Sequence, residues 1–242
     1  MGKVVRLGAP SGIVMCGRFT LRASASVLAE QFAAIADITL VPRFNVAPSQ
    51  PIAVVRERAG SLPPQRELAM VRWGLIPSWA KDPAIGSRMI NARSETVGDK
   101  PAFRAAFRRR RCLVPADGFF EWQRRGKSKQ PYFIQMAGEQ PFAMAGLWES
   151  WTGPDGSEVE SCAILTTVPN ELMEAIHDRM PVILPSEAYG EWLDPEQADP
   201  EPLKRLLAPF DAGQMKVHAV SSYVNRPSNE GPECIAPVAA LF

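Results

Sequence analysis

Proline restricts the fold of this chain more than any other residue, because it is abundant and spread along the whole sequence. There are 23 prolines among 242 residues. A proline inside a helix removes a backbone hydrogen bond and clashes with the preceding turn, so long helices are excluded wherever prolines recur. The chain therefore predicts many short elements joined by turns, and it does not predict a bundle of long helices.

Hydrophobic periodicity, capping residues and turn residues predict more strands than helices. The predicted strands are 52–56, 68–73, 113–114, 132–136, 142–148, 161–166, 182–184 and 217–220. The predicted helices are 24–36, 99–110, 170–178, 186–193 and 202–207. Strands and helices do not alternate regularly. We therefore predict an α+β fold with a mainly antiparallel, barrel-like β-sheet core and peripheral helices.

The overall composition limits where the chain works and what it binds. Apolar residues make up 46% and charged residues 22%, which is ordinary for a water-soluble globular protein. No apolar run reaches the roughly 18 residues of a membrane span. The net charge of +1 means that any contact with DNA depends on a local basic patch. No linker divides the chain, so we expect one domain over 15–242, preceded by an extension or removable leader at 1–14.

The cysteine pattern favours free thiols over a metal site or disulfides. The four cysteines lie far apart and none forms a C-x-x-C pair; they are Cys16, Cys112, Cys162 and Cys234. Only two histidines accompany them, so we expect no metal and no cofactor. The first 14 residues lack the apolar core of a signal peptide, which favours a reducing, cytoplasmic compartment.

Cys16 is the candidate nucleophile, because of the methionine that precedes it. A chain that starts at Met15 and loses that methionine would leave Cys16 with a free α-amine beside its thiol. Both groups are partly available as nucleophiles near neutral pH. Such a 1,2-aminothiol attacks an aldehyde twice, first as a Schiff base and then as a thiazolidine ring. An internal cysteine cannot do this, because its nitrogen belongs to an amide.

Three further polar residues have both a structural and a catalytic interpretation. Asn91 could hydrogen-bond to the backbone of its own loop, or it could bind a sugar hydroxyl or the Cys16 amine. In the second case Arg93 would bind a phosphate. Glu121 stands among apolar neighbours, so it is either a strand-end carboxylate in water or a proton-transfer group with a raised pKa. His177 falls where a helix must end, so it either caps that helix or acts as an acid/base near neutral pH. His218 alternates with apolar residues in a predicted strand and is expected to be structural.

Two segments could contact a nucleic acid. Trp73, Pro77 and Trp79 surround a glycine turn and could pack in the core or form a stacking wall for bases. Four consecutive arginines at 108–111 could form a solvated helix end or contact phosphates.

Eight motifs occur in order over nearly the whole chain. They are MCGRF at 15–19, RFNVAPSQ at 43–50, RWGLIPSWA at 72–80, MINARSET at 89–96, CLVPADGFFEW at 112–122, AGLWE at 145–149, HDRMPVIL at 177–184 and VNRPSNEGPECI at 224–235. Together they resemble the SRAP family, the SOS-response-associated peptidase domains of abasic-site-processing proteins. The family has the α+β, barrel-like fold that is predicted above. Eight motifs in the same order are far more specific than any one of them.

The resemblance implies a monomer that binds single-stranded DNA and captures abasic sites as a covalent thiazolidine on Cys16, a lyase-like DNA–protein crosslinking activity. It also implies autopeptidase removal of the residues before the cysteine. The implied catalytic residues are Cys16, Asn91, Glu121 and His177. The implied DNA-binding residues are Arg18, Asn45, Pro48, Trp73, Pro77, Trp79, Arg93 and Ser94.

Two other functions are compatible with the same residues. A thiol peptidase would use Cys16 as nucleophile, His177 as base and Glu121 to orient it, without any need for a free amine. A single-stranded DNA-binding module without chemistry would need only the tryptophans and arginines, and would be indifferent to Cys16→Ser. The chain also departs from the family pattern, since fourteen residues precede the methionine at which family members usually begin.

Overall fold

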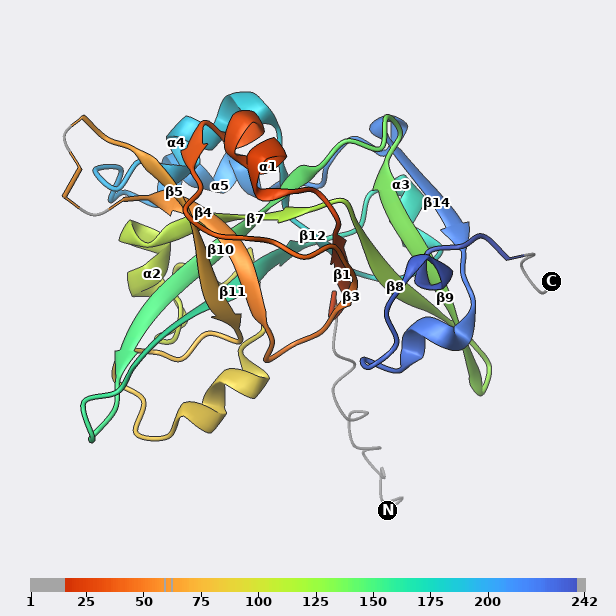
Figure 1. The fold of residues 1–242 in the computed structure, drawn as a ribbon, viewed down its shortest axis with the longest axis horizontal. Helices are drawn as coiled ribbons and strands as arrows, with labels where there is room; N and C mark the ends of the chain where they lie inside the picture. Colours follow the sequence, from red (N-terminus) through yellow and green to blue (C-terminus); the bar gives the residue numbers. More distant parts are fainter. Residues whose placement is uncertain (1–15, 59, 62, 239–242) are drawn as a thin grey trace, which may run out of the picture.

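A closed ring of five strands lies at the centre of the molecule. The computed structural model describes residues 16–58, 60–61 and 63–238. The ring runs in the order β11, β10, β7, β4 and β5, and returns to β11. Its strands are β4 (Pro51–Glu57), β5 (Arg66–Trp73), β7 (Arg111–Ala116), β10 (Phe142–Thr152) and β11 (Glu158–Thr167). Four of the pairings are antiparallel, and the parallel pairing of β11 with β5 closes the ring (Figure 1).

Short strands extend this sheet at its edges. They are β2 (Ala34–Ile35) beside β5, β6 (Asn91–Arg93) and β12 (Met180–Pro181) beside β11, and β13 (Ile183–Leu184) beside β10. The pairings of β6 and β12 meet at Thr166 of β11, which is opposite Arg93 on one side and Pro181 on the other. One end of β11 therefore gathers segments that lie almost ninety residues apart in the sequence.

A second sheet of five antiparallel strands stands beside the ring (Figure 1). Its order is β14 (Met215–Ala219), β9 (Ser128–Met136), β8 (Gly118–Arg125), β1 (Phe19–Leu21) and β3 (Arg43–Val46). Only Asp117 separates β7 of the ring from β8 of this sheet. The chain thus passes directly from the barrel into the strand that carries Glu121.

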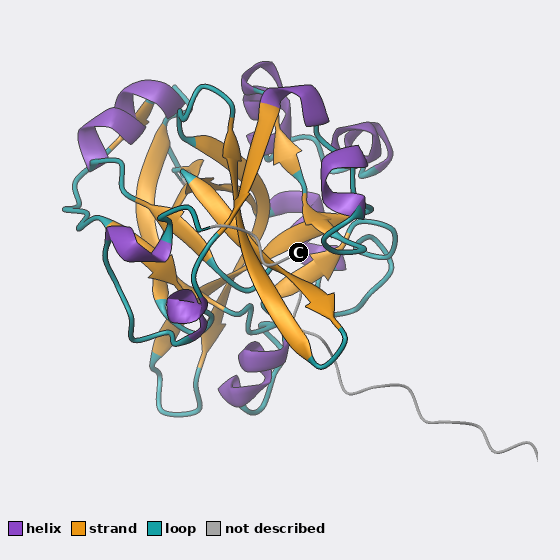
Figure 2. Cartoon of the chain, turned by 90° about the vertical axis from the view of Figure 1, so that its right-hand side faces the viewer, coloured by secondary structure: helices purple, strands orange, loops and turns teal. Residues whose placement is uncertain are grey.

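The helices are short and lie around the outside of the strands (Figure 2). The α-helices are α1 (Ala25–Phe32), α2 (Arg104–Arg109), α3 (Glu171–Glu174), α4 (Tyr189–Leu193) and α5 (Glu201–Lys204). The 3₁₀-helices are η1 (Pro83–Arg88), η2 (Ser186–Ala188), η3 (Arg205–Leu207), η4 (Ala212–Gln214), η5 (Ser222–Asn225) and η6 (Pro232–Cys234). No helix of the described residues is long and apolar enough to cross a membrane. The predicted α+β fold, with a mainly antiparallel, barrel-like core and peripheral helices, is confirmed.

Several predicted helices are shorter in the structure than in the sequence pattern. The first begins after Ser24, whose side chain caps Val27 N as expected, but it ends at Phe32. Ala33 there adopts a left-handed φ of 50°, and the following residues become β2. The helix predicted over 170–178 is one turn long, since α3 ends at Glu174.

Three strands that carry candidate residues were not predicted: β8, β6 and β3, which carries Asn45. On β8, Phe119 packs into the main core while Phe120 packs into a second cluster with Phe133 and Val224. Both faces of β8 are therefore covered, and the alternation that identifies a half-exposed strand is absent. Asn91 was expected in a loop, but it begins β6, which pairs in parallel with a strand more than seventy residues later.

Candidate active site

Cys16 and Glu121 are in direct contact. The pairing of β1 with β8 sets Phe19 opposite Phe119, and it continues toward the N-terminus, since Phe120 N donates to Arg18 O. This register carries Cys16 alongside Glu121. The backbone nitrogen of Cys16 donates a hydrogen bond of 2.6 Å to Glu121 Oε1, and both residues are 2% exposed. The cysteine nitrogen therefore faces a buried carboxyl group.

The surroundings of Glu121 favour its protonated form. Burial raises the pKa of this carboxyl to about 8, because removing water penalises the charge. Hydrogen bonds from the Cys16 and Trp122 backbone nitrogens oppose the shift, and the charge of Asp178 adds to it. Glu121 can therefore both hold and release a proton close to neutral pH, as proton transfer requires.

The Cys16 thiol is held in its neutral form. Burial, followed by the nearby charge of Glu121, raises its pKa well above the usual value. The backbone at Cys16 has a φ of 43°, in the left-handed region that non-glycine residues adopt at a cost of about 1–3 kcal/mol. A neutral thiol is a weak nucleophile, so the geometry favours chemistry that begins at the nitrogen.

His177 lies in the same electrostatic surroundings as Glu121. It follows α3, and Gln123 of β8 donates from Nε2 to Ala175 O at 2.6 Å, which ties this segment to the Glu121 strand. Burial lowers the pKa of His177, against the charge of Asp178, so the ring is mainly neutral at pH 7. Arg179 N lies 3.1 Å from His177 Nδ1. Asp178 Oδ1 lies 3.0 Å from the same ring nitrogen. The amide donates to an unprotonated Nδ1 and the carboxylate accepts from a protonated one, so either tautomer of the neutral ring has a partner at this atom.

Asn91 and Arg93 reach this region through β6. The strand sets Asn91 beside Ile164 and Arg93 beside Thr166 of β11. Thr166 O also accepts a hydrogen bond of 2.6 Å from Arg179 Nη2. The residues after β6 and those after α3 are thereby joined at one end of β11.

The predicted DNA-binding residues fall into two groups. Arg93 and Trp79 are exposed, Trp79 with 59% of its surface, and the partly exposed members are Arg18, Pro48 and Ser94. In contrast, Trp73 is fully buried; its indole donates to Ile90 O at 2.9 Å and packs edge-on against Phe19. Asn45 and Pro77 are buried as well. The buried side chains offer no surface to a base or phosphate, so they position the segments that do.

The run of four arginines is divided by the fold. Arg108 and Arg109 are exposed, whereas Arg110 pairs with Glu149 at 2.7 Å. Arg111 is 3% exposed and donates to the carbonyl oxygens of Phe107, Arg108, Trp192 and Asp194. Burial lowers its pKa to about 10. The expectation of one solvated or phosphate-binding cluster was therefore wrong for Arg111. The helix α2 that precedes it lies on the opposite side of the molecule from β8 and β9 (Figure 1).

Some residues around the site were not singled out from the sequence. Trp122 follows Glu121, and its ring lies 6.0 Å from the Arg18 guanidinium carbon. Arg179 pairs with Glu95 through both of its terminal nitrogens. Asp178 and Lys129 act electrostatically on both Glu121 and His177. Trp122 and Arg179 stand inside quoted motifs, so their position next to Glu121 and His177 was the available signal.

The fold and the site together define a class of protein: a β-barrel in which a buried carboxyl group accepts a hydrogen bond from the backbone nitrogen of a cysteine. Such a cysteine is a candidate aminothiol once its nitrogen is a free amine. The family model of the SOS response associated peptidases (SRAP) matches residues 15–227, and the chain belongs to this family. The abasic site processing protein YoqW of Bacillus subtilis is 48% identical over 225 residues, which cover 91% of this chain and 99% of that protein.

More distant relatives extend the likeness. The abasic site processing protein HMCES of Xenopus tropicalis is 36% identical over 197 residues, covering 72% of this chain and 58% of that protein. A solved structure of a Bacteroides thetaiotaomicron protein has a TM-score of 0.83 at 28% identity, covering 93% of this chain and all of that chain. A Bordetella bronchiseptica protein has a TM-score of 0.74 at 29% identity, covering 85% and 100%.

Proposed function

We propose that this chain captures abasic sites in single-stranded DNA by a covalent bond to Cys16, in a form in which Cys16 is the N-terminal residue. The observation that carries the proposal is the 2.6 Å contact between the Cys16 nitrogen and Glu121 Oε1. Relatives of up to 48% identity that are named abasic site processing proteins support the substrate class. We place this activity in a cytoplasmic monomer.

The chemistry begins at the nitrogen. The ring-opened sugar of an abasic site presents an aldehyde, and the Cys16 amine adds to its carbon. Loss of one water then gives a Schiff base. The Cys16 sulfur adds to the carbon of that Schiff base, and its proton moves to the nitrogen. The products are one five-membered thiazolidine and one water, with no oxidant or reductant required.

Glu121 and His177 have separate roles in this proposal. Glu121 accepts the proton that the Cys16 ammonium must lose before attack, and returns it to the hydroxyl that leaves as water. The pKa of about 8 applies while the Cys16 nitrogen is an amide. An ammonium at the same place lowers the pKa of Glu121, which favours the carboxylate that accepts the proton. His177, which is mainly neutral, assists opening of the sugar ring and reversal of the crosslink. Asn91 positions the sugar.

The DNA strand contacts the exposed residues of the predicted set. Arg93 is exposed on β6 and Arg18 is half-buried two residues after Cys16, so each can pair with a phosphate. Trp79 supplies a stacking surface for bases. Pro48 and Ser94 complete this DNA-contacting surface. The buried side chains of Trp73, Asn45 and Pro77 support it from the protein interior.

Self-removal of the preceding residues would supply the free amine. Water adds to the carbonyl carbon of residue 15, the C–N bond to Cys16 breaks, and the nitrogen leaves as an amine after taking up a proton. Glu121 already contacts this nitrogen and holds a proton near neutral pH. The left-handed backbone at Cys16 adds strain beside the bond that breaks.

The thiol peptidase alternative fits the geometry less well. Such an enzyme attacks with a thiolate, whereas burial raises the pKa of the Cys16 thiol well above its usual value. A DNA-binding module without chemistry does not explain why a buried carboxyl group contacts the Cys16 nitrogen.

The test uses the chain trimmed so that it begins at Cys16. We expect it to form an adduct with a single-stranded oligonucleotide that carries one abasic site, and the adduct should survive denaturing electrophoresis. Cys16→Ala should abolish the thiazolidine, and Cys16→Ser should form at most a less stable adduct. A trimmed wild-type chain that gives no shifted band would refute the proposal.

A further inference from the structure

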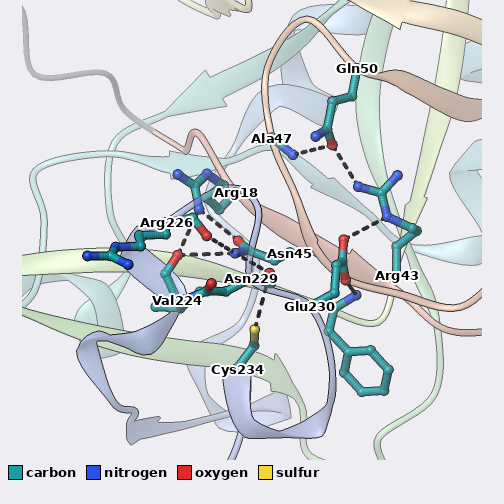
Figure 3. Close-up of polar contacts among 11 residues, drawn as sticks. Arg18, Arg43, Asn45, Ala47, Gln50, Val224, Arg226, Asn229, Glu230 and Cys234 are labelled. Atoms are coloured by element: carbon teal, nitrogen blue, oxygen red, sulfur yellow. Dashed lines mark hydrogen bonds and ion pairs between the residues drawn. The ribbon is translucent and has the colours of Figure 1, made fainter.

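The buried side-chain amide of Asn45 connects the segment after β14 to β3 and to Arg18. Asn45 of β3 is 0% exposed. Its Nδ2 group shares two hydrogens among the carbonyl oxygens of Val224, Arg226 and Asn229, at 3.2, 2.9 and 2.9 Å. Its Oδ1 atom accepts from Arg18 Nη1 at 2.7 Å (Figure 3). The Nδ2 group thus fixes the conformation of the turn at 224–229, while Oδ1 connects the side chain to Arg18.

A second set of contacts holds the same segment from its other end. Glu230 accepts from Arg43 Nε and from Phe44 N, both at 2.7 Å, and thereby covers the free edge of β3 (Figure 3). Val224 is buried in the cluster that contains Phe120. The segment is therefore fixed by apolar packing and by polar contacts, although only two short 3₁₀-helices of regular structure occur in it.

The fixed turn presents an arginine to solvent. Residues 226–229 read Arg-Pro-Ser-Asn, with Pro227 at the second position of a turn, and Asn229 N donates to Arg226 O at 3.0 Å. The Arg226 side chain is exposed and extends away from Asn45 (Figure 3). Its guanidinium has no ion pair or hydrogen bond within the described part of the chain, whereas Arg43 is neutralised by Glu230.

This turn contacts two residues that are close in sequence to Cys16 and Glu121. Trp122, the residue after Glu121, donates from Nε1 to Asn225 Oδ1 at 2.7 Å. Arg18, two residues after Cys16, donates from Nη1 to Val224 O at 2.8 Å. The turn that carries Arg226 is therefore fixed beside the strands of Cys16 and Glu121. It lies on the face of β8 that Phe120 and Trp122 share, opposite to the Glu121 side chain.

We infer that Arg226 binds a phosphate of the DNA strand next to the reactive site, and that Asn45 is the positioning residue that sets the Arg226 turn. An exposed guanidinium without a carboxylate partner fits a phosphodiester oxygen by charge and by hydrogen bonding. The inference rests on the proposed function for the identity of the ligand. It gives Asn45 a role that differs from direct contact with DNA.

The experiment measures affinity for an undamaged single-stranded oligothymidylate as a function of salt, which requires neither a free amine nor an abasic site. Each phosphate contact contributes about 0.7 to the slope of log affinity against log salt for a single strand. Arg226→Ala should flatten the slope by about that amount. Arg205→Ala removes another exposed arginine, one that pairs with Glu191 on another part of the surface, and should leave the slope unchanged.

Asn45→Asp separates positioning from contact. Aspartate still accepts from Arg18 but cannot donate to the three carbonyl oxygens of the turn. We expect at least the loss of slope seen in Arg226→Ala, because the new carboxylate also neutralises Arg18. Adding Arg226→Ala to Asn45→Asp should cause no further loss, because the Arg226 contact is already absent. Circular dichroism checks the fold of Asn45→Asp, while Arg226→Ala alters only an exposed side chain and tests the contact by itself.

The outcomes distinguish this inference from the function on which it rests. A wild-type chain that does not bind the oligonucleotide overturns the Arg226 contact, whereas the proposed capture is overturned only if the trimmed chain forms no adduct with abasic DNA. Wild-type binding with an unchanged slope in Arg226→Ala, or an equal loss in Arg205→Ala, overturns only the Arg226 contact. An Asn45→Asp chain that is folded and keeps the full slope overturns the positioning role.

Discussion

The carboxyl group of Glu121 lies in a buried site that excludes water. Its pKa is raised from the usual 4.5 to about 8 by burial. Between these values the folded chain keeps a proton that the unfolded chain has released. By linkage, the free energy of unfolding then falls as pH rises from about 5 to about 8. One pKa unit corresponds to about 1.4 kcal/mol, so this carboxyl accounts for at most roughly 5 kcal/mol of that fall.

Glu121→Gln should therefore flatten the pH dependence of stability. The amide does not ionise, so the variant loses less stability than the wild type between about pH 5 and about pH 8. Urea unfolding at both pH values measures the difference. The matched control is Glu158→Gln, which changes an exposed carboxyl of β11. Wild-type and Glu121→Gln curves that stay parallel over this range would contradict the raised pKa.

For single residues, the sequence predicted which side chains are candidates for chemistry better than it predicted which residues are in contact. For Glu121 the sequence left two interpretations open, a strand-end carboxylate in water and a group with a raised pKa, and its burial favours the second. The contact with the Cys16 nitrogen joins residues 105 positions apart, and no local pattern records such a pairing. Trp73 was interpreted in two ways, and its complete burial favours the core.

The segment from Gly74 to Ile90 carries Trp79 and depends on two backbones that nearly touch. A Cβ atom at Gly86 would lie 2.6 Å from the carbonyl oxygen of Gly74. A Cβ atom at Gly74 would lie 2.6 Å from the carbonyl oxygen of Gly86. Gly74 also has a φ of 128°, which other residues rarely adopt. Glycine at both positions therefore sets the path of the segment that presents Trp79.

Gly86→Ala should force these backbones apart. We expect the free energy of unfolding to fall by about 1–3 kcal/mol, the usual cost of overpacking, and proteolysis to increase within 74–90. Thermal or urea unfolding and limited proteolysis measure the two effects. Gly98→Ala is the control, since its Cβ atom would meet only Phe107 Cδ1 at 3.9 Å. Equal effects of the two substitutions would show that close approach at Gly86 is not what matters.

Long apolar strands were predicted even where both faces are buried, as in β4, β10 and β11, whereas one mixed strand and the shortest strands were not. The pattern found β4, β5, β9, β10 and β11 within a few residues of their ends. It missed β8, whose successive phenylalanines enter two different clusters. It also missed β1, β3 and β6, which are three or four residues long and depend on strands far away in the sequence for their pairing.

For the whole molecule, the spread of prolines and the excess of short strands were enough to predict the architecture. The closure of the ring through the parallel pairing of β11 with β5 was not predictable, because it joins segments ninety residues apart. The same closure places β6 and β12 on either side of β11. The site is therefore a product of barrel closure and of the β1–β8 pairing, and neither is local.

The extension predicted over 1–14 lies outside the described residues, and it provides the last prediction. A residue upstream of Cys16 turns the amine into an amide, whose lone pair is delocalised into the carbonyl. That nitrogen cannot form a Schiff base, so the thiol alone would give a labile hemithioacetal. A chain locked in its long form by a proline inserted between Met15 and Cys16 should therefore lose the stable adduct with abasic DNA.

A chain trimmed to Cys16 is the comparison, under the same conditions and with the same oligonucleotide. Adduct yield and rate on denaturing gels measure the difference, and the intact mass of each protein before reaction shows which N-terminus it carries. The trimmed form should accumulate adduct while the locked form does not. If the locked form crosslinks as fast and as stably as the trimmed form, the Cys16 nitrogen is not the nucleophile. Glu121 would then face that nitrogen for a structural reason, and reaction through the thiol alone would explain the adduct.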